Sequence, residues 1–248
     1  MRLLVPLRRW DYARRWRARH GTSPRGMPVV YLLHIGKTGG TFLKALLRTP
    51  GALAEEPVLF VPFGHNIRHD HLPGGARFLF ATRDPLTRFV SGFHSRRRKG
   101  RPATFRDWSR AEAAAFARFP TPTALAEALS AADPATRAAA RSAMAGIKHV
   151  AQPQAKWFPD RARLAADIAA GRALRLRQEH LAADLAAVFD RLGCRLAPGR
   201  LEALGRPHAN RYGEGSALSP LAATNLRAHY ADDVAFLGWL DGHGLTGG

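Results

Sequence analysis

The chain has 248 residues, and 38 lysines and arginines stand against 19 aspartates and glutamates, which gives a formal net charge of +19. This length suits one domain with a substantial core and is too short for two large domains. With 46% hydrophobic and 23% charged residues, the composition is not that of a disordered chain. The single cysteine, Cys194, excludes an internal disulfide framework and a four-cysteine zinc site. No apolar run approaches the roughly 20 residues that span a bilayer, and no signal-peptide core is evident near the start, so we expect a cytoplasmic globular protein.

The positive charge is concentrated in two stretches. Residues 1–27 hold eight arginines and one aspartate, and residues 83–106 hold seven arginines, one lysine and one aspartate, so each stretch carries +7. Such clusters attract anions: nucleic acid, a phosphorylated small molecule, an acidic glycan or a membrane surface. Residues 1–27 are predicted to be a basic N-terminal arm. Within it, residues 1–20 place apolar side chains at helical spacing, which is typical either of a helix that contacts a membrane peripherally or of a solvated arm.

Residues 28–248 are predicted to form a single domain in which strands and helices alternate. Residues 29–33 are a continuous apolar run, which is typical of a buried parallel strand, and residues 42–48 are predicted to be helical. Further strands are predicted at residues 58–61, 77–82 and 172–178. The alternation predicts an α/β fold of three layers, P-loop-like, with a central, mainly parallel sheet flanked by helices.

Capping signals place most of the remaining helices. Asp84 and Pro85 predict the start of a helix that ends near Arg98. A helical insertion is predicted over residues 100–150. Its helices begin at the capping box formed by Ser109 and Glu112, near Thr123, and at Asp133-Pro134. A helix over 181–192 stops at Gly193, residues 197–217 are expected to be a loop, and Ser219-Pro220 opens one final amphipathic helix. Its inner face is predicted to carry Leu221, Leu226, Tyr230, Val234, Phe236 and Leu237.

Residues 34–41 read HIGKTGGT and connect the first strand to the first helix of the domain. Backbone N–H groups of such a loop converge on an anion at the start of the helix. Lys37 adds a mobile positive charge, the Thr38 and Thr41 hydroxyls are candidate donors, and Gly39 and Gly40 permit a close backbone approach.

A nucleotide-triphosphatase P-loop, GxxxxGK[ST], is the alternative interpretation of this loop. Gly36, Lys37 and Thr38 fit its end, but position 31, where the first glycine belongs, is Tyr31. A nucleotide kinase therefore remains as the alternative enzyme.

The stretch from Arg83 to Phe93, RDPLTRFVSGF, is the second informative segment. Arg83 follows a predicted strand, and Ser91 lies eight residues later, about 10–12 Å along the helix. At that separation the two side chains could meet at one phosphate. In the alternative, Arg83 pairs locally with an aspartate and Ser91 is merely solvated.

Together the two segments resemble the PAPS-dependent sulfotransferases, specifically the carbohydrate sulfotransferases related to heparan sulfate 2-O-sulfotransferase. That family's loop is close to HIPKTGGT, so Gly36 replaces a common proline, and the Arg83-to-Ser91 spacing is that of its 3′-phosphate segment. The final helix, with Tyr230, Asp233 and Phe236, is also similar. The resemblance is good over residues 29–98, weak over 172–240, and nearly absent over 1–27 and 100–150.

The resemblance implies transfer of a sulfuryl group from 3′-phosphoadenosine 5′-phosphosulfate (PAPS) to a hydroxyl or amine of a carbohydrate or glycolipid, which releases PAP without a metal. Lys37 would neutralise the leaving oxygen, and Arg83 and Ser91 would bind the 3′-phosphate. The loop residues that would hold the 5′-phosphosulfate are Lys37, Thr38, Gly39, Gly40, Thr41 and Phe42.

The acceptor hydroxyl needs a general base, and His65 in the segment GHNIRHDHL is the preferred candidate because it matches a Gly-His segment of the resembled family and titrates near neutrality. His69, His71 and Glu179 are the alternatives. His34 is expected to hold the loop, and His94 to contact the donor or an acidic acceptor.

Arg88 and the run from Arg96 to Lys99 are interpreted as a solvated helix end, as a funnel for anionic substrates, or as both. A non-catalytic polyanion-binding protein would also explain the charge, although no specific nucleic-acid-binding signature is present.

Overall fold

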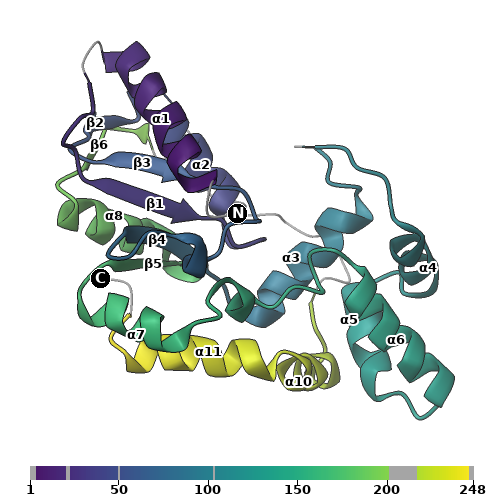
Figure 1. The fold of residues 1–248 in the computed structure, drawn as a ribbon. Helices are drawn as coiled ribbons and strands as arrows, with labels where there is room; N and C mark the ends of the chain where they lie inside the picture. Colours follow the sequence, from purple (N-terminus) through teal and green to yellow (C-terminus); the bar gives the residue numbers. More distant parts are fainter. Residues whose placement is uncertain (1–3, 21–22, 50, 103, 201–216, 246–248) are drawn as a thin grey trace. The chain divides into compact units, whose positions relative to one another are not determined.

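The structure is a computed structural model, and it describes residues 4–20, 23–49, 51–102, 104–200 and 217–245. The described residues form two compact units (Figure 1). Unit 1 draws on residues 1–82, 154–209 and 237–248, and unit 2 on residues 83–153 and 210–236.

A four-stranded parallel sheet organises unit 1, in the order β3-β1-β4-β5. Its strands are β3 (Leu59–Pro62), β1 (Val29–Leu33), β4 (Arg77–Thr82) and β5 (Ala173–Arg177). Helices flank this sheet, so the predicted α/β class with a central parallel sheet is confirmed. A short antiparallel pair, β2 (Leu53–Glu55) with β6 (Arg195–Leu196), was not predicted.

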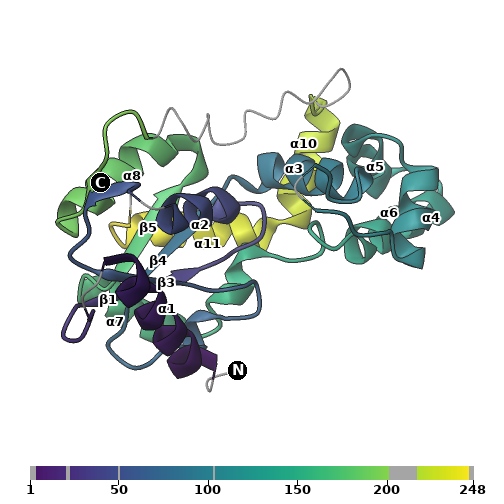
Figure 2. The same cartoon turned by 90° about the horizontal axis from the view of Figure 1, so that it is seen from above.

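The two faces of the sheet bury different side chains, because successive residues of a strand point to opposite faces. On one face, Leu32 and Leu79 join a core with α2 (Gly40–Arg48) and α8 (Leu181–Arg191). On the other, the rings of Phe78 and Phe80 lie 6.5 and 4.6 Å from that of Phe158. α7 (Arg161–Ala169) contacts β5 and α1 (Leu4–His20) lies beside β3 (Figure 2).

Helices make up unit 2, and side chains cap their N-termini. Asp84 accepts from the Thr87 N–H at 2.9 Å, and Ser109 and Glu112 form the predicted capping box. Thr121, two residues before the predicted start, caps the next helix. The bounds are α3 (Pro85–Arg97), α4 (Arg110–Arg118), α5 (Pro122–Glu127), the 3₁₀ turn η2 (Ala128–Ser130), α6 (Pro134–Gly146) and α10 (Pro220–His229).

The final helix was predicted as one piece, and this is wrong. The chain forms α10 and then α11 (Ala231–Gly242), with Tyr230 as the C-cap of α10. Leu221 and Val234, which were assigned to the inner face, are 52% and 44% exposed, because the buried face follows Ala222, Leu226, Tyr230, Asp233 and Phe236 at helical spacing. Most of the loop predicted at 197–217 lies outside the described residues.

Candidate functional site

The loop between β1 and α2 is shaped by two glycines that face bulky neighbours. A Cβ at Gly40 would lie 2.1 Å from His34 Cδ2, and one at Gly39 would lie 2.2 Å from Gln178 Oε1. Gly39 also has φ +91°, and Lys37 adopts a left-handed φ of 68°. Only glycine fits at 39 and 40 without displacing these side chains. The loop backbone therefore packs closely against the side chains of His34 and Gln178.

In this loop, the groups available to an anion are mainly backbone N–H groups rather than side-chain hydroxyls. Thr38 is buried and its Oγ1 donates to the Ile35 carbonyl at 3.0 Å, so its hydroxyl hydrogen is used within the loop. The Phe42 side chain lies in the core, whereas Thr41 is exposed. Gly39, the N-cap of α2, has no side chain to cap the helix, and the first N–H groups of a helix have no intrahelical acceptor. The arrangement gives an anion these N–H groups, the Thr41 hydroxyl and Lys37.

His65 lies beside this loop in unit 1. Its ring centroid is 3.9 Å from that of His34, and its Nδ1 is 3.0 Å from the His34 carbonyl oxygen. Because a carbonyl oxygen only accepts, the Nδ1–H must donate, and in the neutral ring Nε2 then carries the basic lone pair. The ring is exposed, so this geometry suits a proton acceptor.

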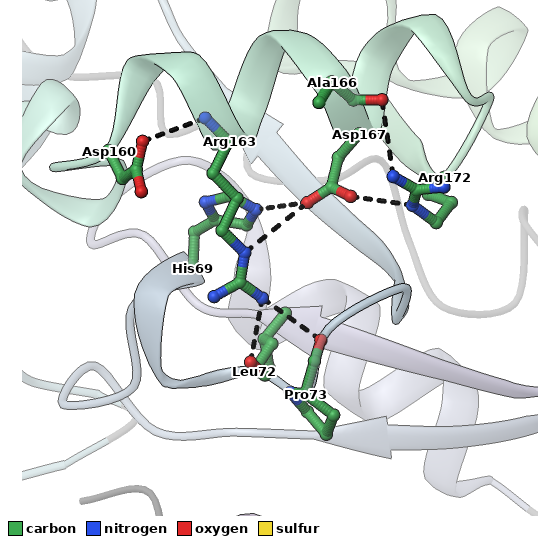
Figure 3. Close-up of polar contacts among 8 residues, drawn as sticks. All are labelled: His69, Leu72, Pro73, Asp160, Arg163, Ala166, Asp167 and Arg172. Atoms are coloured by element: carbon green, nitrogen blue, oxygen red, sulfur yellow. Dashed lines mark hydrogen bonds and ion pairs between the residues drawn. The ribbon is translucent and has the colours of Figure 1, made fainter.

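His69, four residues further on, is used differently (Figure 3). It is fully buried, and its Nε2 lies 2.7 Å from Asp167 Oδ2. Burial is the main cause that lowers the pKa of His69, and the hydrogen bond to Asp167 opposes it. A neutral ring that donates from Nε2 leaves Nδ1 unprotonated, which agrees with a buried Nδ1 that has no hydrogen-bond partner. His69 is therefore a structural group rather than a base for a substrate.

Two arginines complete this cluster in α7 and the following turn. Arg172 Nε donates to Asp167 Oδ1 at 2.7 Å, and Arg163 Nη2 donates to the carbonyl oxygens of Leu72 and Pro73 at 2.8 and 3.1 Å (Figure 3). The cluster pins the segment 64–72 to α7 at its far end, opposite His65.

The two remaining candidate bases are His71 and Glu179, and the hydrogen bonding counts against the first. His71 Nδ1 accepts the Arg68 N–H at 3.1 Å, so the basic nitrogen of its neutral ring is occupied. Glu179 is exposed in the 3₁₀ turn η4 (Gln178–His180). His34 is buried and packs on Gly40, which fits the expected role of holding the loop.

The second predicted segment opens unit 2. Arg83 directly follows Thr82, the last residue of β4, and its Nε donates to Thr87 Oγ1 at 3.1 Å. Ser91 lies on α3 and is buried, and His94, one turn further, is half-buried with a pKa lowered mainly by burial. Within unit 2, Arg83 is thus held by the first turn of α3.

Two arginines of this segment are structural, and their assignment to a solvated or funnelling surface is wrong. Arg88 is 2% exposed and donates from Nη2 to the Gln152 carbonyl at 2.7 Å. Arg96 is 3% exposed and donates to both carboxylate oxygens of Glu112, at 2.6 and 2.8 Å. Both side chains lie in the helical core, where they bind carbonyl or carboxylate partners from other parts of unit 2.

Gln178 is the residue at this site that sequence reasoning did not select. It follows the last residue of β5, and its Oε1 is buried without a hydrogen-bond partner against Gly39. Its position after the carboxyl end of a parallel strand was the available signal, since ligands of open α/β sheets bind at that edge.

Comparisons of the chain with models of protein families, with curated proteins and with solved structures found no match. Within the described ranges, no group of three or more histidine, cysteine, aspartate or glutamate residues could hold a metal ion. Likewise, none of the helices in the described part of the chain has the length and apolar character needed to cross a membrane. The geometry at the sheet edge is therefore the basis for a functional assignment.

Proposed function

We propose that this protein transfers a sulfuryl group from PAPS to a hydroxyl or amine of a carbohydrate or glycolipid acceptor, and releases PAP. The observation that carries the proposal is the bond from His65 Nδ1 to the His34 carbonyl, 3.0 Å long, at the start of the glycine loop. It joins an oriented base to an anion-binding loop within one compact unit. The resemblance of HIGKTGGT and RDPLTRFVSGF to the sulfotransferase segments supports the choice of sulfuryl over phosphoryl transfer.

In the proposed reaction the acceptor oxygen attacks sulfur while its proton passes to His65 Nε2. The new sulfur–oxygen bond forms as the bond from sulfur to the bridging oxygen of the donor breaks. The electron pair of that bond remains on the departing phosphate of PAP. The His34 carbonyl accepts from Nδ1–H throughout, so it stabilises the imidazolium that forms.

Lys37 and the start of α2 would stabilise the charge on the departing oxygen. The left-handed backbone at Lys37 turns the loop immediately before the helix N-terminus, where backbone N–H groups and the helix dipole favour negative charge. Thr38 would contribute its backbone N–H and its support of the loop, and Gly39, Gly40, Thr41 and Phe42 their N–H groups.

The 3′-phosphate is assigned, in this proposal, to Arg83 and Ser91, which would distinguish PAPS from ATP. The remaining positive charge would attract the polyanionic donor and an acidic acceptor. No nucleic-acid partner and no metal enter the proposal. The free, buried Cys194 suits a reducing compartment, and we place the activity in the cytoplasm.

The first test is transfer from radiolabelled PAPS to a panel of glycans and glycolipids, with the product identified by mass spectrometry. Lys37→Gln should lower the transfer rate by about 100- to 1,000-fold, the usual cost of removing one charge-stabilising donor. Lys156→Gln is the control, because Lys156 is an exposed lysine of the same unit that lies outside the loop.

Binding measurements separate the alternatives. PAP should bind more tightly than ADP, and without Mg²⁺. Tight, Mg²⁺-dependent ADP binding with no affinity for PAP would replace the proposal by a nucleotide kinase. Equal loss of transfer and of bulk heparin binding in Lys37→Gln would indicate that net charge, rather than a site, explains both.

A further inference from the structure

The outward face of α1 combines exposed apolar side chains with arginines. Leu7 and Trp10 are 63% and 67% exposed, and Arg14 and Arg17 are exposed further along the helix. Their spacing of three, four and three residues places all four on one side of an α-helix. Leu4, at 40% exposure, extends the apolar end.

The opposite face of α1 holds the helix on unit 1. Val5 and Tyr12 are 2% and 3% exposed, and the Tyr12 hydroxyl accepts from Arg48 Nε and Nη2 at 3.2 and 3.0 Å. Arg9 hydrogen-bonds to Tyr31 of β1. α1 is thus docked through one face, and the stripe formed by Leu7, Trp10, Arg14 and Arg17, here called the outer stripe, points away from the core.

Positive charge predominates around the outer stripe. The single acidic residue of α1, Asp11, is already paired with Arg15 at 3.0 Å and with Arg14 at 3.6 Å. The guanidinium of Arg14 also lies 5.9 Å from the Trp10 ring, which keeps a cation above the aromatic side chain. An anionic surface would meet no unpaired acidic side chain of α1.

We propose that the outer stripe binds the surface of an anionic phospholipid membrane, with Leu7 and Trp10 inserted at the headgroup level and Arg14 and Arg17 on lipid phosphates. Exposed leucine and tryptophan beside arginines match an interfacial helix, whereas a nucleic acid would leave the leucines against water. The inference is independent of the proposed transferase activity. It would place a glycolipid acceptor and the protein on the same surface.

The test is sedimentation of the full chain with vesicles of phosphatidylcholine alone or mixed with phosphatidylglycerol. We expect binding to the anionic vesicles, weakened by added salt. Leu7→Ser combined with Trp10→Ser should lower the partition coefficient about tenfold or more, because two exposed apolar side chains no longer enter the interface. Leu221→Ser changes a leucine of α10 that is 52% exposed, and it should leave the partition coefficient unchanged.

A second pair tests the charge. Arg14→Gln with Arg17→Gln should abolish the preference for phosphatidylglycerol, whereas Arg141→Gln with Arg227→Gln removes the same charge from exposed positions of unit 2 and should preserve it. Equal loss in both pairs would overturn the proposal in favour of net charge. Binding of the stripe to DNA or heparin but not to vesicles would overturn it in favour of a polyanion. Dissociation of a dimer by the apolar pair would show that a second copy covers the face.

Discussion

Two ends of one short segment use histidine in opposite ways. At the start of residues 64–72, His65 is exposed, and its Nδ1 donates to the backbone carbonyl of His34. Near the end, His69 is fully buried, and a carboxylate that also binds Arg172 receives its N–H. The His65 ring is therefore exposed to solvent, whereas burial lowers the pKa of the His69 ring.

This difference separates the residues that stabilise the fold from the residues that are proposed to act on a substrate. Buried charges, such as Asp167 in unit 1 and Arg96 with Glu112 in unit 2, are satisfied by several partners each and serve the fold. Lys37, His65 and Arg83, which could act on a substrate, lie in segments that follow strands, and their side chains are exposed or half-buried. Substitutions should therefore divide into those that change activity alone and those that change stability.

The largest effect is expected at His65. His65→Gln should lower the rate of sulfuryl transfer by about 100- to 10,000-fold, because the general base is lost. The free energy of unfolding should change by less than about 1 kcal/mol, since the side chain is exposed. Steady-state kinetics and guanidinium unfolding measure the two quantities.

His243→Gln is the matched control for this substitution. His243 is also exposed, its Nδ1 lies 2.9 Å from the Trp239 carbonyl oxygen, and its ring centroid lies 4.0 Å from that of Trp239 with the rings tilted by 35°. It has the same local geometry away from the glycine loop, so transfer should be unaffected. An unchanged rate in His65→Gln would reassign the base and remove the functional half of the comparison.

The second effect concerns the buried pair of unit 2. The Glu112 carboxylate accepts from Arg96, and also from the backbone N–H groups of Ser109 and Lys148 at 3.0 and 3.3 Å. Glu112→Gln should lower the free energy of unfolding by about 3–5 kcal/mol, because the buried Arg96 loses its counter-charge. Asp107→Asn breaks an ion pair that is 71% exposed on the aspartate side, and should change the free energy of unfolding far less, because solvent screens the pair. Equal losses of unfolding free energy in the two variants, measured by chemical denaturation, would show that burial does not determine how much each ion pair contributes.

The third effect is smaller and tests the cluster of Figure 3. Asp167→Asn should destabilise unit 1 by about 1–3 kcal/mol, since the buried acceptor of His69 and Arg172 is weakened. Hydrogen exchange should become faster in α7 and in residues 64–72. Asp70→Asn, whose aspartate is paired with Arg68 in the same segment, should leave α7 protected. Faster exchange spread evenly over the chain would argue against a local anchor.

The sequence predicted what depends on neighbours along the chain. The bounds of β1 and β4 and the caps at Asp84 and Ser109 follow from apolar runs and from side chains that bond within four residues. α7 was not predicted, because only two of its nine residues, Leu164 and Ile168, are large and apolar, and because its buried Asp167 is stabilised by partners that include His69, 98 residues away. β2 and β6 have three and two residues, too short for a periodic pattern.

The candidate site, like the fold, could be predicted from the sequence only in part. The loop residues were identified from composition and spacing, whereas the tautomer of His65 depends on a carbonyl 31 residues away. The contact between Gly39 and Gln178 depends on strand order, which places β5 at the end of the sheet beyond β4. Arg88 and Arg96 were misassigned because a run of arginines carries no signal of which side chains face the core.

The last prediction concerns pH, because stability should be lost in two separate steps on acidification. The pKa of His69 is lowered in the folded state, so unfolding takes up a proton there. Stability from this group is complete above the ordinary histidine pKa of 6.5 and falls as the pH drops below it. The pKa of Glu112 is lowered to about 2, although burial alone would raise it, because hydrogen bonds from Arg96 and two backbone N–H groups prevail; its contribution is lost between pH 4.5 and about 2.

Each group can change the slope by at most about 1.4 kcal/mol per pH unit. His69→Gln, which can still donate to Asp167 but does not titrate, should remove the upper window and leave the lower. Glu112→Gln should do the reverse. Hydrogen exchange followed against pH assigns the upper loss to peptides of α7 and the lower to peptides of α4. If both losses occurred in one pH window, the two clusters would titrate as parts of a single cooperative transition, and the division between a local anchor in unit 1 and a buried pair in unit 2 would fail.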